Sequence, residues 1–422
     1  MLVLLTGATG FLGGHLLTAL LAAGHRVRAV ARAPRQALPG VEWVQADFTR
    51  DQTADAWLTH VAGVDAVINA AGILREAPGQ TFDALHEKGP IALFQAAAAA
   101  GVARVIQISA LGADAHATTR YHLSKKRADD VLRALPVTST IVQPSLVYGE
   151  GGASAAMLQR WAALPLIPLP GRGQQAIQPI RIDDLTAAML ALLASPAPPD
   201  RLDAVGPEAI TLRDYLAVLR RSMGLDNAHF VPLPLPLVHA AVRIAAHLPG
   251  SLADPDSLAM LERGNTGNAA AMTALLGRAP HAPSTFIARD MAAAVRTQAL
   301  LAHLLPLVRV SIALVWLVTG YVSLWVYPLA DSLDLLHRTG VPPALAPLML
   351  YGAAGLDFAF GVATLALRRR RPLWLAQMAL VGFYTVVISL HLPEFWAHPY
   401  GPILKNLPLL AAIWLLYQFE EK

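Results

Sequence analysis

The sequence lacks cysteine altogether and has few charged residues. None of its 422 residues is a cysteine, which excludes disulfides, a thiolate nucleophile and cysteine-based metal sites. Charged residues make up 15% and hydrophobic residues 55%, whereas soluble domains carry about 25% charge on average. The net charge is only +4, and the one dense basic run is Arg368–Arg371. We therefore expect neither a disordered chain nor a nucleic-acid-binding protein.

Long apolar runs begin only in the last third of the chain. Before about Arg296, apolar stretches are short and interrupted by charge, glycine or proline. Four long runs then follow, at 307–327, 344–367, 373–392 and 403–419. Because a bilayer core takes about 20 apolar residues per helix, residues 304–422 are predicted to form a membrane domain with four transmembrane helices, the last one short. A buried soluble helical bundle is the alternative.

The run Arg368–Arg371 lies between the second and third predicted spans. Basic loops are retained on the cytoplasmic side of a membrane. Since two crossings separate this loop from the start of the first span, we expect the N-terminal domain to be cytoplasmic as well. The sequence thus predicts a multi-pass protein of a bacterial-type inner membrane, with the lipid bilayer as one partner.

The N-terminus predicts a strand, a glycine-rich turn and a helix. Leu2–Leu5 is an apolar run typical of a buried parallel strand, a helix is expected from about Phe11 to Ala23, and a second strand over Arg26–Ala31. The turn between them is suited to a dinucleotide: Gly7 permits the tight turn, Gly10 a close approach to pyrophosphate, and Gly13 close helix packing. We expect this turn to contact the cofactor through Thr6, Gly7, Thr9, Gly10, Phe11, Leu12 and Gly13. A glycine turn without a ligand is the alternative.

The end of the second strand indicates which nucleotide is preferred. NAD sites place an acidic residue there to bind the ribose hydroxyls, but this strand ends in Ala31-Arg32. A guanidinium is suited to a 2′-phosphate. Arg32 therefore favours NADPH over NADH, unless it is simply a solvated loop residue.

Further strand-like runs alternate with alanine-rich helical segments. They lie at Val41–Gln45, Ala66–Ile68, Val105–Ile108 and Thr140–Val142. This alternation predicts an α/β fold with a doubly wound parallel sheet over residues 1–296. Ligands bind at the carboxyl ends of such strands, so we expect cofactor contacts from the residues that follow them, namely Asp47, Phe48, Asn69, Ala70, Ala71, Gly72, Pro144 and Ser145.

Tyr121 and Lys125 are four residues apart, so they share one face of a predicted helix. A carbonyl reductase must deliver a proton to the oxygen while hydride reaches the carbon. A phenol with a pKa near 10 is a poor acid–base group at neutral pH, and a nearby ammonium favours the phenolate. The pair therefore suits acid–base catalysis, although a solvated helix face has the same spacing.

Five motifs in order resemble one superfamily. They are Thr6–Gly13, Asn69–Gly72, Tyr121–Lys125, Gln143–Gly149 and Ile182–Leu185. Together they resemble the extended or atypical short-chain dehydrogenases/reductases of the NAD-dependent epimerase/dehydratase type, especially the subgroup related to the 39 kDa subunit of respiratory complex I. The C-terminal part, through Leu392–Pro399 and Lys405–Pro408, resembles DoxX-like membrane domains.

The resemblance implies an NADP-dependent oxidoreductase with Ser109, Tyr121 and Lys125 as catalytic residues. In that reading Lys125 also binds the nicotinamide ribose, and Ser109 the substrate oxygen. Residues 149–179 and 205–290 would form the substrate side, where few charges suit an apolar carbonyl, alcohol or quinone-like substrate. A catalytically silent NADP(H)-binding scaffold or redox sensor within a membrane protein complex is the alternative.

Several residues break the expected pattern or stand out in apolar surroundings. Prolines at 165–170 predict a loop, and those at 231–237 predict a rigid linker. Asp357 lies within a predicted span and needs a partner there. No histidine pair has a metal-ligand spacing on a clear helix face, so we predict no metal site.

Overall fold

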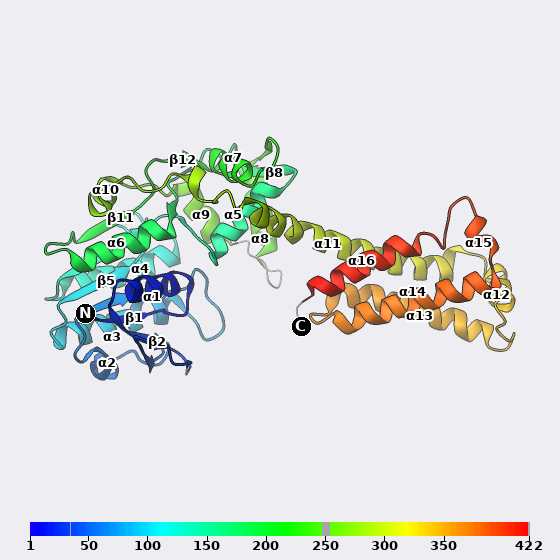
Figure 1. Ribbon diagram of the computed structural model, residues 1–422, viewed down its shortest axis with the longest axis horizontal. Helices are drawn as coiled ribbons and strands as arrows, with labels where there is room; N and C mark the ends of the chain where they lie inside the picture. Colours follow the sequence, from blue (N-terminus) through cyan, green and yellow to red (C-terminus); the bar gives the residue numbers. More distant parts are fainter. Residues whose placement is uncertain (34, 247–253, 421–422) are drawn as a thin grey trace. The chain divides into compact units, whose positions relative to one another are not determined.

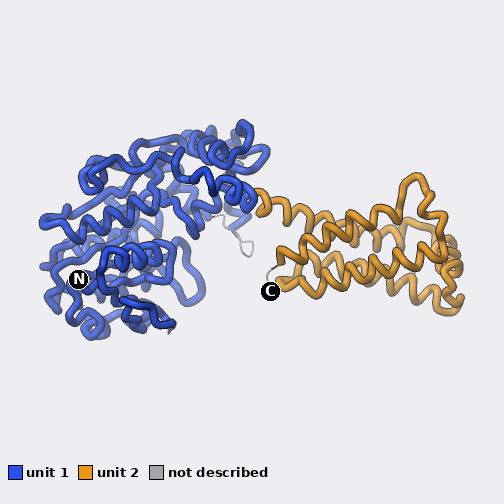
Figure 2. Tube along the Cα trace, in the orientation of Figure 1, with its two compact units in different colours: residues 1–299 blue, residues 300–422 orange. Residues whose placement is uncertain are grey.

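The computed structural model describes residues 1–33, 35–246 and 254–420. The chain divides into two compact units, residues 1–299 and 300–422, which Figure 2 colours separately. Two parts of the predicted domains lie outside the described residues, namely 247–253 on the predicted substrate side and 421–422 at the end of the predicted membrane domain.

A seven-stranded parallel sheet forms the centre of the first unit (Figure 1). Its order is β11-β6-β5-β4-β1-β2-β3, so the chain changes direction across the sheet beside β1. The six predicted strands all form, as β1 (Leu2–Thr6), β2 (Arg26–Ala31), β3 (Val41–Gln45), β4 (Ala66–Asn69), β5 (Arg104–Ile108) and β6 (Ser139–Pro144). The seventh, β11 (Arg201–Ala204), has no clear sequence signal. The predicted doubly wound fold is confirmed.

Helices cover both faces of the sheet (Figure 1). One core lies under α1 (Phe11–Ala22), α6 (Ile182–Ala194) and α10 (Ala270–Leu276). The other lies under α2 (Ala54–Val61), α3 (Gly89–Ala99) and α4 (Arg120–Ala134). Val3 and Leu5 enter the first core and Leu4 the second, because successive strand side chains point to opposite faces. A strand buried on both sides must be apolar throughout, as Leu2–Leu5 is.

The first proline-rich stretch forms a strand, and the second is divided between a strand and the first turn of helix α8 (Leu235–Ala245), so the predictions of a loop and a linker were wrong. β8 (Leu166–Pro170) pairs in parallel with β13 (His229–Leu233), and Val231 lies opposite Pro168. Successive N–H groups of a strand point to opposite sides, so prolines at alternate positions spare the row that makes the ladder. An isolated two-stranded pair tolerates them.

Short elements complete the first unit. They are the π-helical turn η1 (Asp83–Lys88), the paired strands β7 (Val147–Tyr148) and β10 (Ile180–Arg181), the paired strands β9 (Ala176–Ile177) and β12 (Ile210–Thr211), helices α5 (Ala153–Ala163), α7 (Leu212–Ser222), α8 (Leu235–Ala245) and α9 (Pro255–Arg263), and the 3-10 turn η2 (Pro283–Thr285).

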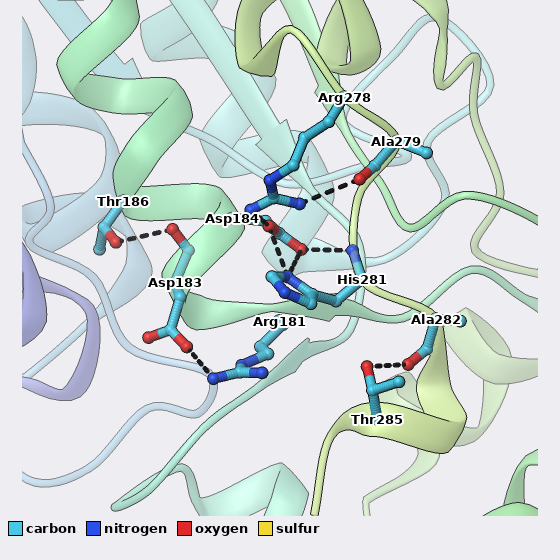
Figure 3. A network of polar contacts seen from close by, with 9 residues as sticks. All are labelled: Arg181, Asp183, Asp184, Thr186, Arg278, Ala279, His281, Ala282 and Thr285. Atoms are coloured by element: carbon cyan, nitrogen blue, oxygen red, sulfur yellow. Dashed lines mark hydrogen bonds and ion pairs between the residues drawn. The ribbon is translucent and has the colours of Figure 1, made fainter. Parts of the chain in front are cut away.

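Asp184, from the Ile182–Leu185 motif, holds the segment after α10 against α6 (Figure 3). Its carboxylate is fully buried and accepts hydrogen bonds from the Arg278 guanidinium at 2.7 Å and from the His281 backbone N–H at 2.7 Å. The His281 ring Nδ1 lies 2.8 Å from the same carboxylate. Asp183 points away and pairs with Arg181. The motif thus serves packing of the unit.

The second unit is helical. Helix α11 (Ala292–Tyr321) crosses the boundary between the units and continues into the π-helical turn η3 (Val322–Val326). The remaining helices are α12 (Leu329–Arg338), α13 (Ala346–Ala366), α14 (Arg371–His391), α15 (Glu394–Ala397) and α16 (Asn406–Phe419). Among the described residues, three helical stretches are long and apolar enough to cross a membrane, at 292–326, 346–366 and 371–391. The fourth predicted span appears as α16, an apolar helix of 14 residues.

Polar side chains of the second unit pair in its interior. Gln377 on α14 donates to the Thr364 hydroxyl on α13 at 2.8 Å, and both side chains are fully buried. Asn406 donates to the Thr385 hydroxyl at 2.8 Å. Asp357 is buried, and its Oδ1 has no hydrogen-bond partner within the described part of the chain. Interior polar groups therefore join the helices to one another.

Charged groups gather at one end of the helices. Glu420 accepts from Arg370 at 3.1 Å and from the Trp374 indole at 3.1 Å, and Arg309 lies 3.5 Å away. Towards the other end Arg338 pairs with Glu394. The ion pairs of the second unit named here therefore lie towards the ends of its long helices.

Candidate functional site

A cavity of about 200 Å³ opens at the carboxyl edge of the central sheet. Ten predicted cofactor residues line it, namely Thr6, Gly7, Thr9, Gly10, Arg32, Asp47, Phe48, Ala70, Ala71 and Gly72. The wall also contains residues that the sequence did not reveal, namely Val30, Ala31, Ala46, Trp57, Ile73, Gln80 and Leu85. Most of these are apolar residues at strand ends or on helices, and their types carry no signal of a binding role.

The glycine turn is shaped for a close ligand. Gly7 has φ +67°, and a Cβ there would lie 2.6 Å from the Ala70 carbonyl oxygen. A Cβ on Gly13 would lie 2.0 Å from the Gly7 carbonyl oxygen. Helix α1 begins beside the cavity with no side-chain cap and no acidic residue in its first turn. Its first N–H groups are therefore left for an anion, and the turn fits the pyrophosphate of a dinucleotide.

Arg32 lies in the cavity wall at the end of β2, and its side chain is exposed. No acid stands at this strand end. Asp47, one strand further, is held in place by its neighbours, since it accepts from the Thr49 N–H at 2.9 Å and donates its own N–H to Asp51 at 2.6 Å. An exposed guanidinium at this end of the cavity has the charge and hydrogen-bond donors that a 2′-phosphate would require.

The Asn69 and Ser145 side chains join strands to neighbouring segments instead of lining the cavity. Asn69 is fully buried, accepts from the Thr6 hydroxyl and donates to Gln107 at 2.7 Å. These bonds link β1, β4 and β5. Ser145 likewise donates to the Gln178 carbonyl at 2.5 Å. Among the predicted cofactor residues, Phe11, Leu12, Gly13, Asn69, Tyr121, Lys125, Pro144 and Ser145 do not line the cavity wall.

Tyr121 and Lys125 lie on α4, next to the cavity. A Cβ on Gly72, a wall residue, would lie 2.9 Å from the Lys125 ammonium. Lys125 is buried and donates to the Ile108 carbonyl at 3.2 Å. Burial lowers the pKa of Lys125 to about 8, and the Asp129 carboxylate opposes that shift. Burial raises the pKa of Tyr121 to about 12, with Asp129 adding to it. Without a bound ligand Tyr121 is thus a neutral proton donor.

His86 is a site residue that the sequence did not reveal. Its Nε2 accepts from the Ile73 N–H at 3.0 Å, and its Nδ1 lies 3.0 Å from the Ser124 hydroxyl. The ring stacks on Phe82 and meets Tyr121 edge-on. Burial, with the charge of Lys125, lowers the pKa of His86 to about 2. A neutral His86 therefore links the loop after β4 to α4 and supports the Tyr121 ring.

Ser109 follows β5 and is engaged by a residue the sequence analysis missed. Its hydroxyl donates to Asp129 Oδ2 at 2.5 Å, and both side chains are buried. Asp129 stands eight residues after Tyr121 and four after Lys125. Helical spacing alone could therefore have placed it beside the pair.

Two family models match the chain. Residues 7–160 match an NAD(P)H-binding family, and residues 313–414 match the DoxX-like family. The DoxX-like match and the three long apolar helices indicate a membrane protein.

Curated relatives match about half of the chain. A ceramide reductase of Caulobacter vibrioides is 31% identical over 199 residues, covering 46% of this chain and 61% of the relative. Subunit 9 of the mitochondrial NADH dehydrogenase [ubiquinone] 1 alpha subcomplex of Arabidopsis thaliana is 30% identical over 251 residues, covering 56% of this chain and 60% of the relative. The chain thus spans about three fifths of the length of these relatives.

Solved structures share the fold of the first unit. An NADPH-dependent quinone oxidoreductase from Escherichia coli has a TM-score of 0.55 at 20% identity, covering 68% of this chain and 99% of its own. A nucleoside-diphosphate-sugar epimerase from Staphylococcus aureus has a TM-score of 0.55 at 17% identity, with 68% and 99% coverage. Together with the family matches, these confirm both resemblances predicted from the sequence.

Proposed function

We propose that this chain, which joins an NAD(P)-binding Rossmann domain to a DoxX-like domain, is a membrane-anchored NADPH-dependent reductase of apolar carbonyl or quinone-like substrates. The observation that carries the proposal is the position of Gly72 between the cavity and Lys125. Its backbone lines the dinucleotide cavity and also lies against the Lys125 ammonium. This contact supports a role for Lys125, one member of the predicted acid–base pair, beside the predicted nucleotide site.

Each site residue would have a separate role in the reduction. The α1 N-terminus would hold the pyrophosphate, Arg32 the 2′-phosphate, and Lys125 the nicotinamide ribose. A bound NADPH supplies a hydride. Tyr121 supplies the proton to the carbonyl oxygen, and its raised pKa keeps that proton on the ring until the substrate oxygen becomes basic. The charge of Lys125 then stabilises the phenolate that remains.

Two observations support a lipid-like substrate. One relative, 31% identical over 199 residues, is named ceramide reductase, and that name points to a lipid. The C-terminal helices would keep the enzyme at the surface where such a substrate resides. Residues 149–179 and 205–290 would provide the substrate side of a domain covering 1–296.

The proposed topology places the Rossmann domain in the cytoplasm. Arg370 and Arg309 lie with Glu420 at the same end of the helices, and basic residues favour the cytoplasmic side. With the short α16 as fourth span in the domain 304–422, both chain ends would lie there, in a bacterial-type inner membrane.

A second function is favoured by a specific contact. The Ser109 proton is engaged by Asp129, and in this state Ser109 cannot donate to a carbonyl. A relative is named as a subunit of NADH dehydrogenase. The chain would then be a silent NADP(H)-binding scaffold or redox sensor of a membrane complex.

A single preparation distinguishes the two functions. The full chain in lipid nanodiscs is assayed for released nucleotide after heating, and for NADPH oxidation with a long-chain keto lipid in the bilayer. A reductase exchanges its nucleotide and reduces the lipid, and Tyr121→Phe abolishes turnover while retaining NADPH binding. Nucleotide that never exchanges, without turnover, indicates the scaffold. If the chain binds neither NADPH nor NADH, both functions are excluded.

A further inference from the structure

Ser109 has a single hydroxyl proton, and in this structure it points to Asp129 at 2.5 Å. Ser109 can then offer only lone pairs to a substrate. A carbonyl oxygen also has only lone pairs, so it gains no hydrogen bond from Ser109 in this state. An alcohol carries its own hydroxyl proton and can donate a hydrogen bond to Ser109 Oγ. The existing contact therefore suits the alcohol and not the carbonyl.

Asp129 is placed so that its protonation state can change. The side chain is fully buried, and its Oδ1 has no partner among the residues that the structure describes. Lys125, one turn away, donates to the Ile108 carbonyl. Burial raises the pKa of Asp129 to about 6, opposed by the Ser109 bond and by the charges of Lys125 and Arg133. Asp130 adds to the rise.

The surroundings leave few other groups that could titrate in its place. On α4 the charged or titratable neighbours are Tyr121, Lys125, Asp130 and Arg133. From η1, His86 faces Lys125 and stays neutral because burial lowers its pKa. From the sheet comes the neutral Ser109, which is hydrogen-bonded to Asp129.

We infer that Asp129 is a positioning residue that sets the direction in which Ser109 donates its hydrogen bond, and thereby selects the carbonyl or the alcohol. This rests on the proposed reductase function. A protonated Asp129 donates to Ser109 Oγ, and the Ser109 proton turns towards the substrate carbonyl. An ionised Asp129 accepts from Ser109, which then accepts from an alcohol. The proton taken up by Asp129 stays there, while Tyr121 protonates the substrate oxygen.

The test compares two neighbouring aspartates in the full chain in nanodiscs. With NADPH and a long-chain keto lipid, kcat/KM for reduction should fall by about tenfold per pH unit above pH 6, as for one required proton. Asp129→Asn provides an amide that can donate a hydrogen bond at any pH. In this variant kcat/KM should therefore fall less as the pH rises, and at pH 8 it should exceed the kcat/KM of the parent. Asp130 is an exposed carboxylate on the same helix. Asp130→Asn should keep the fall, displaced only slightly to lower pH because the Asp130 charge is the smallest contribution to the Asp129 pKa. An unchanged fall in Asp129→Asn overturns the inference.

Two readouts do not depend on turnover. Infrared difference spectra between pH 8 and pH 5 should show a protonated carboxyl band that Asp129→Asn lacks and Asp130→Asn retains. An acid whose pKa is raised by folding loses stabilising effect as pH rises through that pKa. The unfolding temperature of Asp129→Asn should therefore rise relative to the parent between pH 5 and pH 8.

The outcomes distinguish failure of the Asp129 inference from failure of the proposed reductase function. If no keto lipid is reduced at any pH although NADPH binds, the reductase proposal fails, and the infrared band still decides whether Asp129 changes state. If reduction occurs but no Asp129-specific band appears, the inference fails and the reductase remains. Should Asp129→Asn not fold, Asp129→Glu is used, which should shift the fall in rate without removing it.

Discussion

Two glycines of the first unit and one of the second are packed against different kinds of neighbour. In the first unit, Gly7 and Gly13 press backbone against backbone around an open cavity. In the second, Gly361 lies mainly against the Leu317 side chain, and polar pairs such as Thr364 with Gln377 tie helices together. Backbone contacts cannot adapt, whereas side chains can. A methyl group added at Gly7 or Gly13 should therefore force the backbone to move, whereas one added at Gly361 should mainly displace a side chain.

The largest expected effect comes from Gly13→Ala. The new methyl group would lie 2.0 Å from the Gly7 carbonyl oxygen, so the turn must move. We expect NADPH affinity to fall about a hundredfold, equivalent to about 3 kcal/mol. The matched control is Gly14→Ala, whose methyl group meets its nearest atom at 3.8 Å. Fluorescence titration with NADPH measures both, and equal losses would contradict the backbone argument.

Next is Asp184→Ala, which removes the buried carboxylate in Figure 3. Its partners Arg278 and His281 are partly exposed, so water can reach them. We expect the free energy of unfolding to fall by about 2–3 kcal/mol, which is at or below the usual range for breaking a buried ion pair. Asp183→Ala, which breaks an exposed pair with Arg181, should lose less than about 1 kcal/mol. Denaturant unfolding of the full chain compares the two variants. Similar losses of stability would show that Asp184 does not stabilise the packing of the segment after α10 against α6.

A smaller effect is expected from Arg32→Ala. Loss of a charge-assisted bond to a 2′-phosphate costs about 1.5–3 kcal/mol, so NADPH affinity should fall tenfold or more. NADH affinity should hardly change. Arg26→Ala, at the opposite end of the same strand, is the control. Parallel titrations with both nucleotides measure the ratio, and an equal fall for NADH would refute the NADPH preference.

The smallest effect is expected in the second unit, from Gly361→Ala. Its methyl group would meet the flexible Leu317 side chain at 2.5 Å, which can move aside. We expect the free energy of unfolding, measured in detergent, to fall by about 1 kcal/mol. Gly382→Ala, with no neighbour within 4 Å, should be neutral. If Gly361→Ala were as damaging as Gly13→Ala, the contrast between the two units would not hold.

The sequence by itself determined the fold of the first unit and the apolar character of the second. Parallel strands buried on both faces must be apolar throughout, and Leu2–Leu5 shows this directly. The glycine turn was equally readable, because only glycine tolerates the φ of Gly7 and the approach at Gly13. Ten of the predicted cofactor residues line the cavity, from the glycine turn and from the segments that follow the carboxyl ends of the strands.

Only the tertiary structure decided which polar residues meet. Asn69 follows a strand as a ligand residue would, but it bonds to Thr6 and Gln107 from neighbouring strands. His86 has no local signal, and its role arises from packing against Tyr121. The Ser109–Asp129 bond joins residues 20 apart. Hydrophobic periodicity is a local property of the chain, whereas a hydrogen bond between distant residues exists only when the fold brings both to the same place.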